Sequence, residues 1–174
     1  DFCGYRYISQ YDIDFNFIRN IGYNGGAPDT DNSFRRVRTI KSFNGYLYAL
    51  DTRLNQIIKY NGSNPSSSPS IWNLSSLIPN SDNIYPVDMN NDSSGNLYVL
   101  IVNDDNCKVS IAKFNNTGTF ISQTELPDFD YYSSSMRITI NDSGWIYLSV
   151  YEKVYVYDAA LTKINEFGGY GSDL

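Results

Sequence analysis

The clearest pattern of apolar and polar positions lies between residues 91 and 118. Residues 97–102 form a run of β-branched, aromatic and other apolar side chains that is too short for a helix and predicts a strand. Residues 109–114 alternate between two faces, which predicts a second strand. Turn sequences border both strands at 92–95 and 115–118, where Gly supplies positive φ and Asx or Ser side chains bond the nearby backbone.

The same unit recurs upstream and downstream, so the chain is built from repeats. The turn glycines Gly45, Gly95 and Gly144 occupy equivalent positions, 50 residues (45 to 95) and 49 residues (95 to 144) apart. One strand precedes each glycine. Three strands follow it: the first is strongly apolar, the second ends in an aromatic residue and a turn, and the third is more polar. The strands are expected at 37–40, 46–50, 56–63 and 71–77, then at 86–89, 96–102, 109–118 and 119–125, and then at 136–140, 145–150, 153–160 and 161–167.

Four strands in a repeat of about 50 residues are typical of a β-propeller blade. A parallel β-helix would have a shorter period, and an immunoglobulin-type sandwich would not repeat itself. We therefore expect an all-β protein, a β-propeller of four-stranded antiparallel blades. Each blade buries its faces only against its neighbours, so the stacking of blades stabilises the fold.

The two ends of the chain align with each other. Residues 6–25 match residues 152–171 without gaps, and Asp12 falls on Asp158. The chain therefore begins at the third strand of a blade and holds about three and a half blades. We expect a single propeller segment over residues 1–174, with a partial blade at 1–34 and blades at about 35–80, 81–130 and 131–174.

Several motifs of the repeat resemble those of the NHL-repeat β-propeller family. A Phe-x-x-x-Ile-Gly-x-x-Gly segment lies at 17–25, and a Gly-Asn-Leu-Tyr-Val strand lies at 95–99. An Asp-x-x-x-Asn-x-Ile motif, here called the elbow, lies at 51–57, and an aromatic residue, Tyr60 or Phe114, precedes the next turn. The resemblance covers nearly the whole chain. It departs at 103–106, where the second blade has Asn-Asp-Asp-Asn in place of the elbow, and at the short Tyr-Glu-Lys of residues 151–153.

The resemblance implies a closed ring of typically about four to eight blades, so three and a half blades form an incomplete ring or an open arc. A longer parent chain would complete the ring. The alternative is an arc completed by neighbouring subunits, whose sheet edges must be paired. Among six-bladed relatives, the resemblance includes metal-dependent lactonases and the lyase that completes peptide amidation. Both use metal ligands and charged groups gathered at the channel mouth, and the lyase uses His.

The composition restricts the chemistry that this chain can perform. It has 16 Tyr, 9 Phe, 13 Lys+Arg, 19 Asp+Glu and no His, with a formal net charge of −6. The absence of His excludes imidazole bases and His-ligated zinc within this sequence. The negative charge argues against nucleic acid and anionic membranes as partners. No apolar run approaches the roughly 20 residues that span a bilayer. We therefore expect no catalytic residue, no cofactor and no membrane insertion.

Pairs of carboxylates in polar loops leave a calcium site as the one metal hypothesis. Calcium takes oxygen ligands, and the candidate calcium ligands are Asp104 and Asp105. No pair has the spacing of an EF-hand, and a solvated loop is the alternative for each. The other pairs are Asp128 with Asp130 and Asp29 with Asp31.

Five Asn-x-Ser/Thr sequons indicate a glycosylated, exported protein. Turn chemistry alone would also place Asn beside Ser or Gly at four of them. The fifth, Asn73, lies on an expected strand and is the least explained by turn chemistry. Asn61 and Asn115, between the third and fourth strands, are the sites that we expect to be occupied first. The remaining two are Asn91 and Asn141.

Cys3 and Cys107 leave several pairing states open. They are two free thiols, a disulfide pair, or partners of cysteines outside this sequence. The two residues belong to blades that are not adjacent, and a disulfide requires Cα atoms within about 7 Å. This placement favours an intermolecular bond over an internal one.

The tyrosines divide into two groups. Tyr5, Tyr7 and Tyr11 alternate along the first expected strand, and we expect such tyrosines mainly in the core. Tyr23, Tyr131 and Tyr132 lie in expected loops. Tyr contributes a large contact area and a hydroxyl, so these three form the candidate binding surface.

The leading functional hypothesis is a non-enzymatic, exported scaffold or protein-interaction module, extracellular or at the cell surface. Its partners would be proteins or further copies of itself, with a homo-oligomer expected if the chain is complete. The alternative is a segment of a larger propeller hydrolase or lyase whose catalytic residues lie outside this chain. A third hypothesis is a structural subunit of a filament built from stacked arcs.

Overall fold

The structure is a computed structural model, and it describes residues 7–22, 34–64, 68–79, 83–126, 136–150 and 152–169. Apart from one short helix, the regular elements of these residues are strands, and all of their pairings are antiparallel. They form three four-stranded sheets and one two-stranded sheet. The expected all-β fold of four-stranded antiparallel blades is confirmed.

Within each sheet the strands follow one another in chain order. The two-stranded sheet, here called the half-blade, holds β1 (Ile8–Tyr11) and β2 (Phe17–Ile21). The first blade holds β3 (Val37–Phe43), β4 (Tyr46–Asp51), β5 (Gln56–Asn61) and β6 (Ser70–Asn73), followed by α1 (Leu74–Leu77). The second holds β7 (Ile84–Asn91), β8 (Leu97–Asn103), β9 (Lys108–Phe114) and β10 (Phe120–Leu126). The third holds β11 (Arg137–Ile140), β12 (Ile146–Val150), β13 (Lys153–Tyr157) and β14 (Lys163–Gly168).

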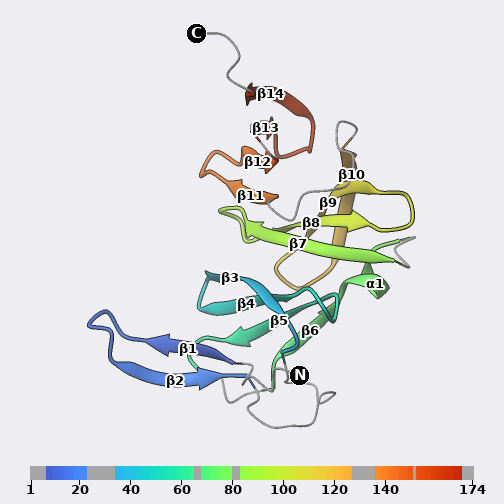
Figure 1. Cartoon of the computed structure of the whole chain (residues 1–174). Coiled ribbons are helices and arrows are strands. Elements are labelled where there is room, and N and C mark those ends of the chain that lie inside the picture. The colour runs from blue at the N-terminus through green and yellow to red at the C-terminus, as the bar shows by residue number, and fades with distance from the viewer. Residues whose placement is uncertain are drawn as a thin grey trace.

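The sheets stack along an open arc. Figure 1 shows them in sequence from the half-blade at one end to β11–β14 at the other. The first strand of the second blade, β7, contacts both β3 and β11, so the first strands of the three blades lie side by side. Helix α1 has four residues, and no helix in the described ranges is long and apolar enough to cross a membrane.

Local turn chemistry explains the repeat. The turn glycines Gly45, Gly95 and Gly144 have φ values of 75°, 83° and 80°, a region that Gly enters without steric cost. The two ends of the chain also share a turn. In both Asp12 and Asp158, the Oδ1 atom accepts backbone N–H groups from the residues two and four positions later. The half-blade therefore has the turn of the last two strands of a full blade.

The expected fourth strand at 71–77 is wrong in its second half. Strand β6 ends at Asn73, and residues 74–77 form α1. The Asn73 side chain accepts the Ser76 N–H at 3.1 Å, which caps the helix. The helical turn places the fully buried Leu74 in the core. Asn73 was the sequon that turn chemistry explained least, and its capping role accounts for it.

The elbow of the second blade differs in sequence and is similar in structure. Asn103 Oδ1 accepts the N–H groups of the residues two and three positions later, as Asp51 Oδ1 does in the first blade. The elbows end in Asn55 and Cys107, both with positive φ, at 51° and 56°. A side-chain oxygen at the first position therefore suffices for this turn, whether it belongs to Asp or Asn.

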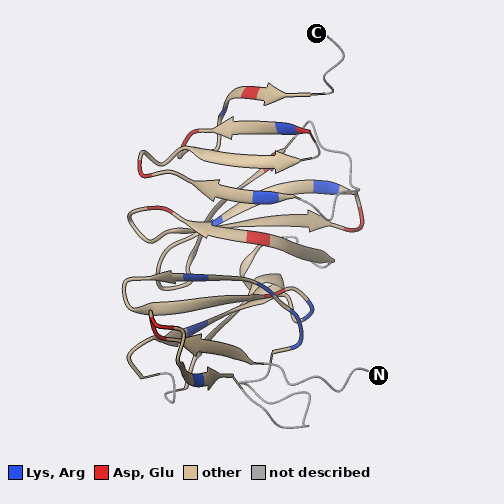
Figure 2. Cartoon of the chain, turned by 60° about the vertical axis from the view of Figure 1, so that its left-hand side comes forward, with Lys and Arg blue, Asp and Glu red and all other residues tan. Residues whose placement is uncertain are grey.

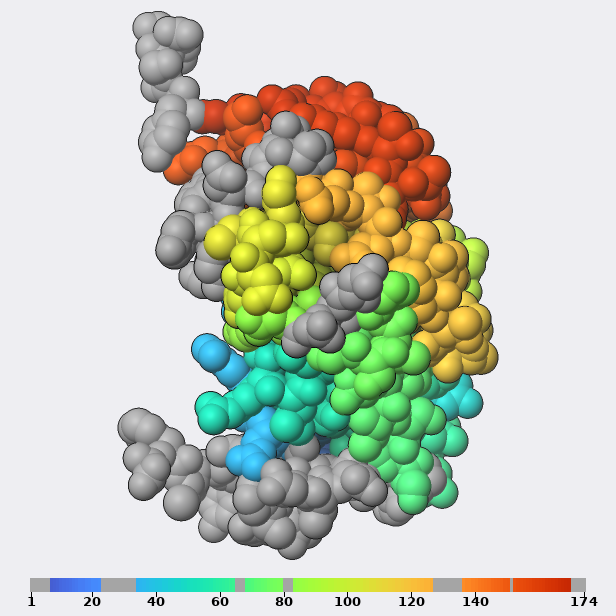
Figure 3. All heavy atoms as spheres, turned by 90° about the vertical axis from the view of Figure 1, so that its right-hand side faces the viewer, coloured from blue at the N-terminus to red at the C-terminus, as the bar shows by residue number. Residues whose placement is uncertain are grey.

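Three apolar clusters fill the spaces between consecutive sheets. Each cluster takes buried residues from both of the sheets that it joins, so packing between blades supplies the core. In Figure 3 the colours follow chain order from one end of the molecule to the other, as expected for stacked sheets. Large buried members are Phe34 and Tyr60 in the first cluster, Trp72 and Phe114 in the second, and Tyr98 and Tyr157 in the third.

Candidate functional site

A buried carboxylate joins the inner strands of three blades. Asp88, on β7, is 6% exposed. One of its oxygens accepts the Thr39 hydroxyl of β3, and the other accepts the Ile138 N–H of β11 at 3.0 Å. Asn90 adds a bond from its Nδ2 to the Thr139 hydroxyl at 3.2 Å. Both carboxylate oxygens of Asp88 are therefore occupied by neighbouring blades, and its role in this arrangement is structural.

A second buried carboxylate organises the elbow of the first blade. Asp51 is fully buried and accepts the backbone N–H groups of Arg36 at 3.1 Å, Arg53 at 3.0 Å and Leu54 at 3.2 Å, together with that of Arg35. Four donors on one carboxylate satisfy a charge that would otherwise be costly to bury. The Asp51 carboxylate therefore holds the loop before β3 against the elbow after β4.

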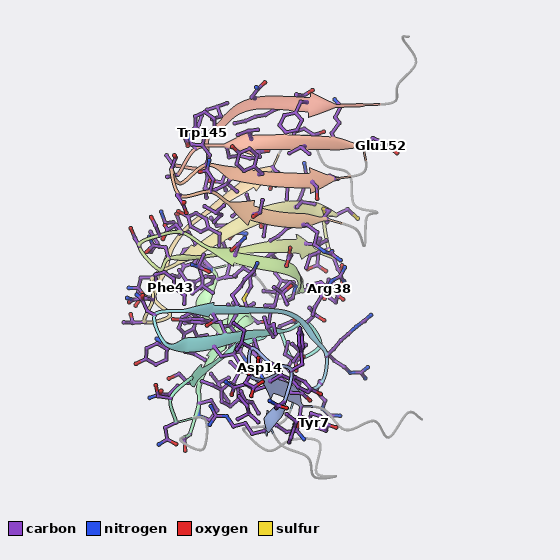
Figure 4. The ribbon with its side chains drawn as sticks, turned by 90° about the vertical axis from the view of Figure 1, so that its left-hand side faces the viewer. Tyr7, Asp14, Arg38, Phe43, Trp145 and Glu152 are labelled. Atoms are coloured by element: carbon purple, nitrogen blue, oxygen red, sulfur yellow. The ribbon has the colours of Figure 1, made fainter. Side chains whose placement is uncertain are left out.

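Arginines gather at the same end of the first blade. Burial alone would raise the pKa of the Tyr85 phenol, but hydrogen bonds with Thr52 and Arg38 and the charges of Arg36 and Arg38 together lower it below its ordinary value. Figure 2 shows Lys and Arg along the segment that leads into β3. In Figure 4, Arg38 and Glu152 lie at one end of the sheets, and Phe43 and Trp145 lie at the other.

The calcium candidates that the structure describes belong to a turn. Asp104 and Asp105 are exposed; the Asp104 N–H donates to the Asn83 carbonyl at 2.9 Å, and Asp105 Oδ1 accepts Asn83 Nδ2 at 2.9 Å. The described ranges hold no group of three or more His, Cys, Asp or Glu side chains that could bind a metal. A calcium site at this pair stays a prediction. The other pairs, Asp29 with Asp31 and Asp128 with Asp130, lie outside the described residues.

The five sequon asparagines differ in how their side chains are used. In Asn61, Asn73 and Asn115, the side-chain hydrogen bonds use Oδ1 as the acceptor for turn or helix-cap groups. In Asn91 and Asn141, Nδ2 donates, to the Asp92 carbonyl at 3.1 Å and to the Tyr147 hydroxyl at 3.3 Å respectively. An N-linked glycan is attached at Nδ2. A glycan on Nδ2 of the first three residues would therefore leave these bonds intact.

The cysteine and loop-tyrosine predictions remain open. Cys107 is exposed and free at the end of its elbow. Cys3 lies outside the described residues, as do Tyr23, Tyr131 and Tyr132. The disulfide and the predicted tyrosine surface therefore stay predictions.

Exposed aromatic residues gather instead on the half-blade. The third strand of each full blade ends in an aromatic residue, Tyr60, Phe114 or Tyr157, that is at least 98% buried between blades. The equivalent residue of the half-blade is Tyr11, and it is 54% exposed. Tyr11 belongs to the tyrosines that we expected mainly in the core, and it is exposed because no described sheet covers this face.

The half-blade reproduces the aromatic pairing of a full blade. The rings of Tyr11 and Phe17 lie 5.9 Å apart at 75°, and those of Phe114 and Phe120 lie 5.9 Å apart at 72°. Phe114 and Phe120 pack into the cluster between the first and second blades. Tyr11 and Phe17 have the geometry of a blade interface but lie on an exposed face. The alignment of residues 6–25 with 152–171 was the sequence signal that identified this position.

The other end of the arc also exposes apolar side chains. All residues of β14 are exposed, including Ile164 and Phe167. Lys153 and Lys163 bind Glu166 at 2.9 and 2.8 Å on the same edge. Hydrogen bonds from Lys163 and Lys153 lower the pKa of Glu166 to about 2. The candidate functional site of the chain is therefore the pair of exposed ends of the arc.

Comparisons with known proteins support the fold. No protein-family model and no curated protein matches the chain. A protein of unknown function from Bacteroides caccae has 13% identity and a TM-score of 0.60, over 95% of this chain and 55% of its own. Apo AztD from Citrobacter koseri has 18% identity and a TM-score of 0.56, over 97% of this chain and 44% of its own. Prolyl oligopeptidase B from Galerina marginata has 13% identity and a TM-score of 0.50, over 90% of this chain and 21% of its own.

These similar structures are β-propeller proteins. The chain spans about half the length of the first two of them. At such low identity the likeness concerns the fold alone. The chain is a β-propeller segment in the form of an open arc.

Proposed function

We propose that this chain is a non-enzymatic, exported β-propeller scaffold that binds polypeptides through the ends of its arc. The observation that carries the proposal is the exposure of apolar side chains at both ends. Tyr11 and Phe17 are exposed at one end and Phe167 at the other, whereas Phe114, the equivalent of Tyr11 in the second blade, is buried between blades. Grouped, exposed apolar side chains are typical of surfaces that bind another protein.

Export to the extracellular space or the cell surface is supported by the sequons. Asn61 and Asn73 are exposed, and their bonds leave Nδ2 available for a glycan. The repeat motifs support a relationship to NHL-repeat propellers. The proposal needs no cofactor, nucleic acid or membrane insertion. It includes self-assembly into an oligomer or filament as one form of polypeptide binding.

The native mass of the protein from its natural source tests this proposal. We expect a native mass above that of one polypeptide, and a polypeptide mass that falls on deglycosylation. Phe167→Ser should lower the native mass. Ile40→Ser is a matched control, because Ile40 is 47% exposed against 52% for Phe167 but lies on β3, away from either end. A native mass of one polypeptide without glycans would overturn the proposal.

A second candidate function is a segment of a larger propeller hydrolase or lyase. It is favoured by one observation, that similar structures extend to about twice the length of this chain. The catalytic residues would then lie outside this sequence. A denatured, reduced polypeptide mass well above 19.8 kDa would favour it. So would a melting temperature that falls after dialysis against a chelator, since a calcium-dependent enzyme should lose stability and a plain scaffold should not.

A further inference from the structure

We propose that Arg36, Arg38 and Tyr85 bind a phosphate or sulfate group where the first blade meets the second. This site goes beyond the proposed function, because it holds a small anion at residues away from both ends of the arc. Three features support it: a fixed backbone, two adjacent bulges, and a phenol that faces the arginines from the next blade.

The backbone fixes Arg36 at the elbow of the first blade. Asp51 Oδ1 accepts the Arg36 N–H at 3.1 Å. The Arg36 carbonyl accepts the Thr52 N–H at 3.0 Å and the Thr52 hydroxyl at 3.3 Å. The backbone of Arg36 is therefore bonded in both directions, while its side chain is exposed. A donor group with a fixed base loses less conformational freedom when it binds a ligand.

Two bulges lie side by side next to these residues. The pairing of β3 with β4 shifts its register just before Thr39, and that of β7 with β8 shifts just before Asp88. Arg38 lies within the first shift, and Tyr85 lies just before the second. The Thr39 hydroxyl donates to Asp88, so the two irregular segments are adjacent. Bulges re-aim side chains and are frequent next to active sites.

Tyr85 adds a donor of a different type from the second blade. Its phenol hydrogen-bonds with Thr52 and Arg38, and the charges of Arg36 and Arg38 act on it. Both guanidinium groups therefore lie near one phenol oxygen. Tyr85 and Arg38 are partly buried, and Thr52 beneath them is buried. A guanidinium group has five N–H donors in a planar fork, so its bond to a phenol is compatible with further bonds to a ligand.

These donors favour a tetrahedral oxyanion. Two guanidinium groups supply two positive charges, and the donors belong to two different sheets. A phosphate or sulfate group presents oxygens in several directions, whereas a carboxylate presents two oxygens in one plane and fits a single fork. The whole chain has a net charge of −6, so general electrostatic attraction does not draw an anion to it. Binding should therefore depend on this local group of side chains.

The test titrates inorganic phosphate into the full chain by isothermal titration calorimetry at low ionic strength. We expect saturable binding that is tighter for phosphate and sulfate than for acetate. Arg36→Gln should weaken phosphate binding at least about ten-fold, because it removes a charge and a donor fork. Arg53→Gln is the matched control and should leave binding unchanged: Arg53 is also exposed and its N–H also donates to Asp51, but its charge is not among those that act on Tyr85. Unchanged melting curves without phosphate would show that both variants fold.

The titration of Tyr85 gives a second readout. Burial raises the pKa of its phenol, and its hydrogen bonds together with the charges of Arg36 and Arg38 lower the pKa below its ordinary value. Phosphate that neutralises these charges should therefore raise the pKa of Tyr85. The difference in ultraviolet absorbance between the full chain and its Tyr85→Phe variant follows this one phenol as the pH rises. The increase should be absent in Arg36→Gln.

The remaining outcomes are distinct. Equal losses in Arg36→Gln and Arg53→Gln would mean non-specific attraction and would overturn the proposal. Acetate that binds as tightly as phosphate would also overturn it, as would phosphate binding that leaves Tyr85 unchanged. Phenyl phosphate that binds more tightly than inorganic phosphate would support the site and assign it to a phosphorylated molecule, and the reverse order would support it as a site for the free anion. The Phe167→Ser experiment does not involve these residues, so the proposed function stands if this inference fails.

Discussion

The replacement of Asp88 tests how the blades are held together. Asp88→Ala removes the acceptors of the Thr39 hydroxyl and the Ile138 N–H. Each hydrogen bond to a charged group contributes about 1.5–3 kcal/mol, and a buried N–H without an acceptor costs about 1–3 kcal/mol. Removal of the carboxylate recovers part of its desolvation cost, which is about several kcal/mol. We expect the free energy of unfolding to fall by about 3 kcal/mol, out of a typical total of about 5–15 kcal/mol.

Urea unfolding followed by circular dichroism measures this loss. With a slope of about 2 kcal/mol per molar, the midpoint should fall by about 1.5 M. Asp88→Asn should cost only about 1 kcal/mol, because the amide can accept the Ile138 N–H and donate to the Thr39 hydroxyl. Asp105→Ala is the matched control, since Asp105 is an exposed carboxylate with one side-chain partner, and its loss should stay within about 0.5 kcal/mol.

A double-mutant cycle separates the bridge from general effects. Asp88→Ala and Thr39→Val should couple by about 1 kcal/mol, because the two residues share one hydrogen bond across the blade boundary. If Asp88→Ala costs less than about 1 kcal/mol, or if the coupling is absent, the carboxylate does not hold the blades together and the reasoning fails.

Three further outcomes are expected. Gly118→Ala should lower the free energy of unfolding in urea by about 2–4 kcal/mol, because the φ of Gly118 is +90° and a Cβ there would lie 2.6 Å from the Trp72 ring. Gly45→Ala is the control and should cost only about 1 kcal/mol, because Gly45 has a similar φ of +75° but open space around it. Equal losses in the two variants would contradict this. Tyr60→Phe should leave the free energy of unfolding unchanged or raise it by about 1 kcal/mol, because the buried Tyr60 hydroxyl has no hydrogen-bond partner among the described residues. The same burial raises the pKa of Tyr60 to about 12. A clear loss of stability would show that the hydroxyl has a partner. The pKa of Glu166 is lowered from 4.5 to about 2, so its contribution to stability is present above pH 4.5 and lost as the pH falls toward 2. Glu166→Gln should therefore flatten the melting-temperature curve in this range, and an unchanged curve would count against the ion pairs.

Much of the fold could be predicted because its signals are local. A turn depends on residues within about five positions, and the glycines at 45, 95 and 144 all adopt the positive φ that the period predicted. The equivalence of the chain ends was also visible in the sequence, since Asp12 and Asp158 make the same turn. The elbow at 103–107 looked like a departure, but Asn103 supplies the same side-chain acceptor as Asp51.

Less of the packing between blades, which decides what the ends of the arc expose, could be predicted, because it depends on neighbours that are distant in the chain. Asp88 bonds to residues 49 and 50 positions away, and no local pattern distinguishes it from a solvated Asp. The α1 turn replaced the end of a predicted strand because Leu74 is buried there and Asn73 caps the helix.

The sequence by itself determined the repeat, the strand order within each blade and the turns, because backbone conformation follows local chemistry. Only the tertiary structure decided which of the equivalent aromatic residues are buried. Phe114 and Tyr11 occupy the same position of the repeat, yet one is fully buried and the other 54% exposed. The difference arises because burial of an aromatic residue depends on an adjacent sheet, and the sequence of the residue's own strand does not specify that sheet.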